Sequence, residues 1–260
     1  LNSGGNPANF AHAMPMKSGD LLNVRDIEQA LENFKRVPTA DADFSIAPSS
    51  RMTTPGYSDI QVKWQQGKRW RLSASVDDSG QESTGVYQGN VTLSLDNPTW
   101  HNDLLYLSYN HNLDGGGDGD DNGSVGYNIG YVVPIKNTQL TVTHSGYDYD
   151  QTVAGVNQDY IYSGESYNTE ALVSHLVHRD SHSKTYLKVG GFAKQQNNFI
   201  DDTEIEVQKR RTAGYKAGIG YETIIGKTQW IGDVMYQRGT GAFDAIDPPE
   251  ALFNEGSARA

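Results

Sequence analysis

The chain has 260 residues, no cysteine and a formal net charge of -11, with 32 acidic and 21 basic side chains. Nucleic-acid-binding proteins usually carry a basic face, so this charge balance argues against a nucleic-acid partner. The lack of cysteine excludes disulfides, thiolate nucleophiles and Cys-ligated metal sites. No run of about 18 apolar residues occurs, so the sequence predicts no transmembrane helix.

The overall polarity contrasts with the local pattern. A mean hydropathy of -0.62 would fit a loop-rich soluble protein. Yet 28 glycines and 15 tyrosines accompany short segments in which apolar and polar residues alternate. Such a pattern is typical of a transmembrane β-barrel, because only every second strand residue faces lipid. The first residues do not resemble a signal peptide, so we expect a mature or truncated chain.

The N-terminal part predicts a small α+β module. Residues Asn23–Val37 form an amphipathic pattern with a suitable N-cap at Asn23, and Pro38 ends it. The apolar residues of this helix form one stripe: Val24, Ile27, Leu31 and Phe34. Two strand-like segments follow, around residues 42–47 and 58–64, and we expect the apolar stripe to pack on the sheet that they form.

From Trp70 onward the pattern has a period of two residues, which predicts antiparallel strands. The apolar positions of the clearest segments contain no Asp, Glu, Lys or Arg, and a charge near the bilayer midplane would cost roughly 2–4 kcal/mol there. The residues predicted to face lipid include Val91, Leu93, Ile129, Tyr131, Val189 and Ile219. The residues predicted to line a hydrated lumen are Arg71, Asn90, Thr92, Asn128, Lys184, Lys188 and Lys216. Glu222 and Asp77 are the expected ion-pair partners of the lumen cations. The segment 168–178 does not define its two faces.

The predicted connections alternate in length, as in outer-membrane barrels with tight periplasmic turns and long extracellular loops. Short turns are expected near residues 134–138, 179–183 and 226–227. Long loops are expected at residues 114–124, 148–163 and 197–203, and beyond 239. Trp70, Trp100 and Trp230 fall on the inferred periplasmic side, where an aromatic girdle belongs. About nine strands are expected, and since closed bacterial barrels have an even number, we expect a fragment of a larger barrel.

Several segments carry a family resemblance: LLNVRDIEQALENFKRVP, PGYSDI, SVDDSGQESTGVYQG and DNPTWHNDLLYLSY. Their order and spacing resemble the two-partner secretion transporters, the haemolysin or haemagglutinin secretion/activation proteins of the Omp85 superfamily. The resemblance implies an incomplete periplasmic POTRA-type domain over residues 1–67 and the first strands of an outer-membrane barrel over 68–260. It also implies a secreted partner protein, such as an adhesin, haemolysin or toxin. Partner-binding residues implied within the module are Arg25, Glu28, Gln29, Ser58 and Asp59.

Two motifs suggest metals but fit them poorly. Residues 118–123 imitate the start of a calcium loop, but Ile129 stands where a Glu ligand belongs, so a solvated loop is the better interpretation. His175, His178 and His182 have helical spacing, yet they lie at a strand end and turn, where positions 175 and 178 should point to opposite sides. We therefore predict no metal site, no cofactor and no catalytic residue.

Three functions remain open from the sequence. The leading hypothesis is an outer-membrane transporter, located in the bacterial outer membrane with its N-terminal part in the periplasm. The second is a passive channel or porin, which shares the strand pattern but does not need the N-terminal module. The third is a soluble β-rich binding protein. Further alternating strands after residue 260 would favour the first.

Overall fold

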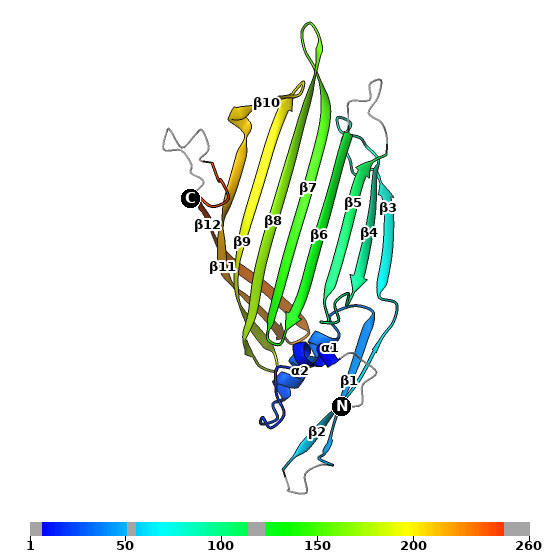
Figure 1. The fold of residues 1–260 in the computed structure, drawn as a ribbon, viewed down its shortest axis with the longest axis vertical. Helices are drawn as coiled ribbons and strands as arrows, with labels where there is room; N and C mark the ends of the chain where they lie inside the picture. Colours follow the sequence, from blue (N-terminus) through cyan, green and yellow to red (C-terminus); the bar gives the residue numbers. More distant parts are fainter. Residues whose placement is uncertain (1–6, 51–55, 114–122, 247–260) are drawn as a thin grey trace.

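The computed structural model describes residues 7–50, 56–113 and 123–246, which form a small helix–hairpin module and one large sheet (Figure 1). The module consists of helices α1 (Pro7–Ala13) and α2 (Val24–Phe34) and strands β1 (Ala40–Pro48) and β2 (Ser58–Gln66). Strands β1 and β2 pair antiparallel, with Phe44 opposite Val62. Within the described residues, no helix is both long and apolar enough to cross a membrane.

Helix α2 begins as predicted and ends earlier. The Asn23 side chain accepts a hydrogen bond of 2.9 Å from the backbone N–H of Arg25, as an N-cap does. The helix ends at Phe34 rather than Val37, because Lys35 already has the non-helical angles φ -93° and ψ 10°.

The core of the module gathers around Phe34. This ring is fully buried, with ring centroids 5.2 Å from Phe10 and 5.8 Å from Phe44. Leu31 packs at the margin of this core, but Val24 is 58% exposed, so the prediction that the whole stripe packs on the small sheet is wrong at its N-terminal end. The physical reason is that α2 also buries a polar side, which carries Gln29 and Asn33, so its packing is not set by the apolar stripe alone.

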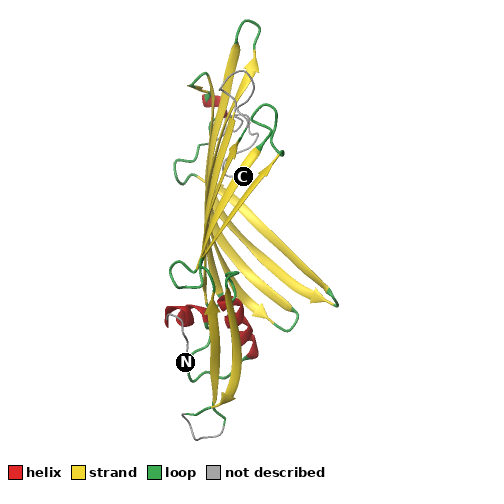
Figure 2. Ribbon diagram, turned by 90° about the vertical axis from the view of Figure 1, so that its right-hand side faces the viewer, coloured by secondary structure: helices red, strands yellow, loops and turns green. Residues whose placement is uncertain are grey.

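The large sheet is antiparallel, and its path runs β3-β4-β5-β6-β7-β8-β9-β11-β12. The strands span Trp70–Asp77 (β3), Gln88–Asp96 (β4), Leu104–Asn112 (β5), Gly123–Ile135 (β6), Thr138–Ala154 (β7), Asp159–Arg179 (β8), Ser183–Ile200 (β9), Arg210–Ile225 (β11) and Thr228–Thr240 (β12). A two-residue strand β10 (Thr203–Glu204) pairs with β9, and a 3-10 turn η1 (Glu206–Gln208) follows it. The sheet curves, with β11 and β12 swinging away from the plane of the other strands (Figure 2).

Two of the predicted long loops are wrong, because the strands continue through them. Strands β7 and β8 pair as far as Ala154 opposite Asp159, so only four residues connect them. Strand β9 likewise continues to Ile200 and turns back at once. The ladder is made by backbone N–H and C=O groups, which polar residues also carry, so a polar composition did not mark the strand ends here. The predicted loop 114–124, including most of the calcium-like motif, lies largely outside the described residues.

The sheet remains open in the described part of the chain, because β3 and β12 are its two ends and do not pair with each other. This confirms the predicted fold class: a mainly β chain with part of an antiparallel barrel, preceded by a small α+β domain.

Candidate functional site

The strand register sorts the predicted residues onto two faces. Directly paired residues in an antiparallel sheet lie on the same face. Thr92 pairs with Ser108, which pairs with Asn128, and the Thr92 and Ser108 hydroxyls lie 2.8 Å apart. Continued across the sheet, this register places all the predicted lumen residues on one face, which we call the inner face.

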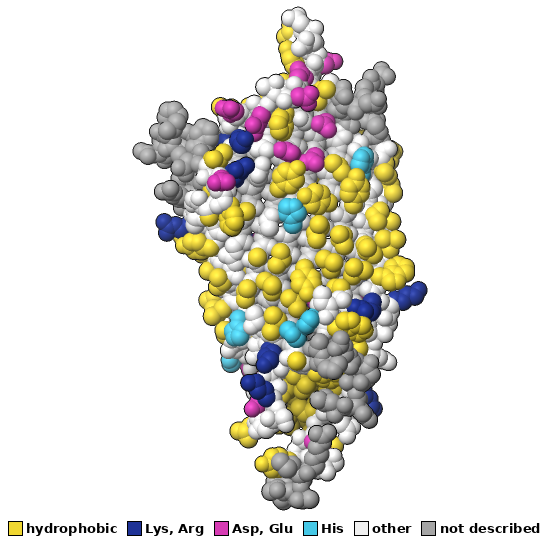
Figure 3. All heavy atoms as spheres, viewed as in Figure 1, with side chains coloured by type: hydrophobic (Ala, Val, Ile, Leu, Met, Phe, Trp, Pro, Cys, Tyr) yellow, Lys and Arg dark blue, Asp and Glu magenta, His cyan; other side chains and the backbone are white. Residues whose placement is uncertain are grey.

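The opposite, outer face carries the residues predicted to contact lipid. Leu93 pairs with Leu107, which in turn pairs with Ile129. Val189 pairs with Val173 on one side and with Ala217 on the other. Hydrophobic side chains cover the middle of this face, and acidic side chains gather at the end of the sheet that carries the β7–β8 turn, at the top of the view (Figure 3). Such an apolar band, bordered by polar groups, is what the hydrocarbon layer of a bilayer requires.

Ion pairs cross the inner face from strand to strand. Lys216 contacts Glu170 at 2.5 Å, and Lys188 forms an ion pair with Asp233. Lys184 lies 3.9 Å from Glu222, as expected from the sequence. Arg71, in contrast, pairs with Asp96 at 2.9 Å and not with Asp77, which lies at the other end of β3.

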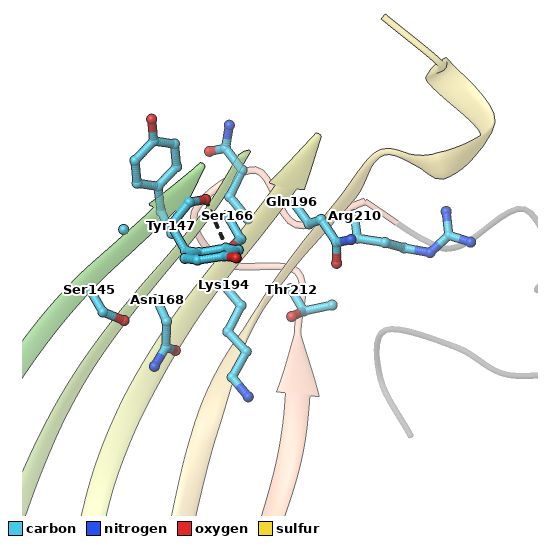
Figure 4. Close-up of a pocket in the computed structure, with 11 residues that line it drawn as sticks. Ser145, Tyr147, Ser166, Asn168, Lys194, Gln196, Arg210 and Thr212 are labelled. Atoms are coloured by element: carbon cyan, nitrogen blue, oxygen red, sulfur yellow. Dashed lines mark hydrogen bonds between the residues drawn. The ribbon is translucent and has the colours of Figure 1, made fainter. Parts of the chain in front are cut away.

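A polar hollow of about 380 Å³ lies in the inner face between β7 and β11. Its labelled lining residues are Ser145, Tyr147, Ser166, Asn168, Lys194, Gln196, Arg210 and Thr212 (Figure 4). Ser145, Asn168 and Lys194 follow one another across the strands, and each offers a hydrogen-bonding group at the same level. A wall of this composition is suited to contact with water.

Helix α2 lies at the end of the sheet that carries the β6–β7 and β8–β9 turns, against the inner face (Figure 1). Arg179 donates hydrogen bonds to Glu28 (3.1 Å), Gln29 (2.9 Å) and Glu32 (2.8 Å). Lys184 donates a further one to Glu32 at 2.7 Å. A polar cavity of about 340 Å³ remains between the helix and the wall.

The contact continues along α2. The Asn33 side chain donates to the carbonyl oxygen of Lys136 at 2.8 Å, and the Arg36 guanidinium donates to Gln139. Burial lowers the pKa of Arg36. The polar side of α2 is therefore an interface with the sheet.

The charges at this interface favour ionised carboxylates. Burial raises the pKa of Glu32, but hydrogen bonds and charge from Arg179 and Lys184 outweigh that effect, and its pKa lies below the ordinary value. The pKa of Glu28 is lowered in the same way, against a burial effect, by Arg25 and Arg179. The wall cations Arg179 and Lys184 thus stabilise the ionised carboxylate of Glu32, whereas that of Glu28 is stabilised by Arg25 of α2 itself together with Arg179.

Helix α1 contacts two turns at the same end of the sheet. The backbone N–H of Lys136 donates to the His12 carbonyl oxygen at 2.7 Å, and the His12 and His101 rings lie 4.3 Å apart, edge to face. Burial lowers the pKa of His12, and the charges of His101 and Lys136 lower it further.

A bulge in β8 explains how Arg179 reaches the inner face. Leu176 pairs with Tyr186, but His178 pairs with Thr185, so β8 has one extra residue there. Arg179 therefore stands opposite Lys184 on the inner face, whereas an unbroken alternation would have turned it outward. The same shift places His175 and His178 on one face, which corrects the expectation that they point to opposite sides.

Among the described residues no metal-binding group of His, Asp or Glu occurs.

The structure separates the predicted partner-binding residues. Arg25, Glu28 and Gln29 lie on α2, where Arg25 pairs with Glu28 at 2.6 Å and both Glu28 and Gln29 contact Arg179. Ser58 and Asp59 lie at the start of β2, at the far end of the hairpin, where Asp59 accepts hydrogen bonds from Ser49 and Ser50. Partner binding by these residues stays a prediction. The residues predicted from the sequence do not include Glu32, Asn33, Arg36 and Arg179, because the partners of these side chains lie more than 100 residues away along the chain.

A buried polar cluster joins the module to the β4–β5 turn of the sheet. Asp96, Asn97, Asn102 and Asp103 are all fully buried within the segment DNPTWHND. Asp96 accepts hydrogen bonds from Thr39 (2.8 Å) and Arg71, and the Asn97 amide donates to Gln66 at 3.1 Å. This cluster belongs to the part of the chain that carries the family resemblance.

An open antiparallel sheet with an apolar outer face, a charged inner face and a helical module at one end defines part of an outer-membrane β-barrel protein. The family described as haemolysin secretion/activation protein ShlB/FhaC/HecB matches residues 56–260, and the POTRA domain family matches residues 1–48. The chain belongs to the ShlB/FhaC/HecB family of haemolysin secretion/activation proteins. It is therefore a protein of the bacterial outer membrane with its N-terminal part in the periplasm.

Individual relatives agree with this assignment. The outer membrane transporter CdiB-2 of Burkholderia pseudomallei (strain 1026b) is 32% identical over 235 residues, which cover 90% of this chain and 39% of the relative. CdiB of Dickeya dadantii (strain 3937) is 26% identical over 251 residues, 94% of this chain and 44% of the relative. The chain thus spans about two fifths of the length of these curated relatives.

Solved structures support the fold. CdiB from Acinetobacter baumannii superposes with a TM-score of 0.81 at 30% identity, over 92% of this chain and 45% of that one. CdiB from Escherichia coli gives a TM-score of 0.86 at 24% identity, over 94% of this chain and 45% of that one. At 24% identity, the similarity to the Escherichia coli structure shows the fold alone.

Proposed function

We propose that this chain is the periplasmic end and the first part of the wall of a transporter that moves a secreted partner protein across the outer membrane. The observation that carries the proposal is the docking of the POTRA-type helix α2 on the charged inner face of the sheet. The relatives named outer membrane transporter or hemolysin transporter belong to the same functional class. A porin would not need such a module at its periplasmic end.

The division of labour follows the two parts of the chain. Residues 1–67 would belong to the POTRA-type domain, which captures an unfolded partner either at a β-edge or in a groove beside α2. Residues 68–260 would form the first strands of the barrel, whose polar inner face lets an extended chain pass. We propose transport without a covalent step and without a cofactor, with folding outside the cell providing direction.

The outer face of the sheet would contact the membrane. Val91, Ile129, Val189 and Ile219 are exposed on the outer face, and we propose that they contact outer-membrane lipid. The partner would be an exported adhesin, haemolysin or toxin. The excess of acidic residues does not favour nucleic acid as a partner.

The proposal is tested with the full-length protein that contains this chain. It is expressed in the outer membrane of a host that lacks it, together with the exoprotein encoded beside its gene, and the culture supernatant is assayed for that exoprotein. Secretion that depends on the transporter supports the proposal. Uptake of small solutes without any secretion of the exoprotein would favour a porin and overturn it.

A further inference from the structure

One contact between the module and the sheet has the properties of a specific latch. The Arg179 side chain is only 10% exposed and donates hydrogen bonds to two carboxylates and one amide of α2. A guanidinium suits this position because its planar fork can satisfy several acceptors at once. Lys184, the cross-strand partner of Arg179, adds a second cation against Glu32.

The backbone is arranged for this contact. The bulge between Leu176 and His178 turns Arg179 towards the inner face, and without the extra residue its charge would face outward, near the bilayer. Bulges of this kind commonly redirect a side chain to a functional position. Glu28 and Gln29 are adjacent and Glu32 lies about one helical turn further along, so the three acceptors present one side of α2 to the guanidinium.

We propose that Arg179 is a positioning residue that latches the POTRA-type helix α2 to the inner wall of the barrel and so sets where the periplasmic module delivers its cargo. The proposal rests on the proposed transport function. It also bears on partner binding, since Glu28 and Gln29 are engaged by the wall whenever the latch is closed. A partner segment can bind these two side chains only after the latch opens.

The latch is tested by cross-linking in the full-length transporter, with any native cysteines replaced. Cysteines are introduced by Arg36→Cys and Gln139→Cys, because these side chains touch across the interface next to the latch. A short bismaleimide should join α2 to the wall efficiently when Arg179 is present. With Arg179→Glu, repulsion from Glu28 and Glu32 should lower the cross-linking rate on the order of tenfold.

Three further variants separate the latch from a general structural effect. Arg179→Lys should retain an intermediate rate, because an ammonium keeps the charge but lacks the planar fork. Combining Arg179→Glu with Glu28→Arg should recover much of the lost cross-linking. Lys209→Gln removes the ion pair with Glu204 at the opposite end of the sheet and should change nothing.

Secretion of the partner is measured in the same strains, and heat-modifiable migration checks that each barrel has assembled. We expect Arg179→Glu to lower secretion several-fold and the Glu28→Arg combination to restore part of it. If Arg179→Glu does not assemble, Glu28→Gln with Glu32→Gln weakens the same contact from the helix side.

The outcomes are distinct. Unchanged cross-linking in the Arg179→Glu or the double Gln variant overturns the latch. Lost cross-linking with undiminished secretion overturns its role in transport. Failure of the unmodified transporter to secrete, with cross-linking intact, overturns the proposed function and leaves the latch standing.

Discussion

The Thr39 hydroxyl donates a hydrogen bond of 2.8 Å to the buried carboxylate of Asp96, which joins the helix–hairpin module to the end of β4, where the β4–β5 turn begins. Arg71 holds the same carboxylate through two hydrogen bonds of 2.9 and 3.1 Å. The module thus contacts the sheet through Asp96 as well as through Arg179 on the inner face.

Asp96→Ala should weaken the attachment of the module. Asp96 is fully buried, so its removal leaves Thr39 and Arg71 without their acceptor, at a cost of about 1–3 kcal/mol. We expect faster proteolysis of residues 7–66 in the assembled full-length protein. Glu204→Gln, which breaks an ion pair at the far end of the sheet, is the matched control and should leave the digestion unchanged. Equal digestion of both variants would contradict the prediction.

Phe34 should matter far more to the module than Val24. Phe34→Ala removes a fully buried ring between Phe10 and Phe44 and should cost about 3–5 kcal/mol. Val24→Ala changes a largely exposed side chain and should stay within about 0.5 kcal/mol of the parent. Hydrogen exchange of α2 in the assembled protein measures both. Similar protection in the two variants would show that the core around Phe34 does not hold α2 in place.

The orientation of the strands is tested by single cysteines. Asn128→Cys on the inner face should react with a polar maleimide from the water-filled side, whereas Ile129→Cys should react only with a lipid-soluble reagent. The pair consists of neighbours in one strand, so each serves as the control for the other. Identical labelling at the two positions would contradict the assignment of Asn128 to the inner face and Ile129 to the outer face.

Acidification should loosen α1 from the turns of the sheet. Burial, together with His101 and Lys136, lowers the pKa of His12 below 6.5, so the neutral ring is favoured in the folded contact. Its stabilising effect is present above pH 6.5 and is lost as the pH falls through the lowered pKa. We expect α1 to lose protection from hydrogen exchange as the pH falls from about 6.5 towards 5, after correction for intrinsic rates. His12→Gln cannot gain this proton and should show no such loss, and a loss that persists in this variant would assign the effect to another group.

The periodic features of the fold could be predicted from the sequence, and the features that interrupt a period could not. Thr92 and Asn128 obey strict alternation, and the register places them on one face as expected. Segment 168–178 did not define its faces, and the structure shows that β8 carries a bulge just where this segment ends. Arg179 could not be assigned to the inner face because one inserted residue changes the side on which every later side chain lies.

The candidate site depends on contacts between distant segments, which no local pattern reveals. Glu32 and Arg36 look like ordinary solvated charges on a helix, and only the folded chain shows that they meet Arg179, Lys184 and Gln139. The strand lengths of β7 and β8 escaped prediction for a different reason. The halves of these strands next to the β7–β8 turn lie beyond the apolar band. The hydrophobic alternation that marks a strand therefore disappears there, although the pairing continues.

The 260-residue chain by itself should not form a closed barrel. In the described part of the chain, β3 and β12 each have one neighbour only, and each leaves a row of backbone N–H and C=O groups at an open edge. In hydrocarbon each unpaired group costs several kcal/mol, so the sheet needs further strands before it can enter a bilayer. Folded into detergent or lipid, the chain alone should migrate identically on gels with and without boiling, whereas the full-length protein should stay compact until heated. Heat-modifiable migration together with ion conductance from the 260-residue chain alone would show that its edges close, within one copy or between copies, and would contradict the prediction.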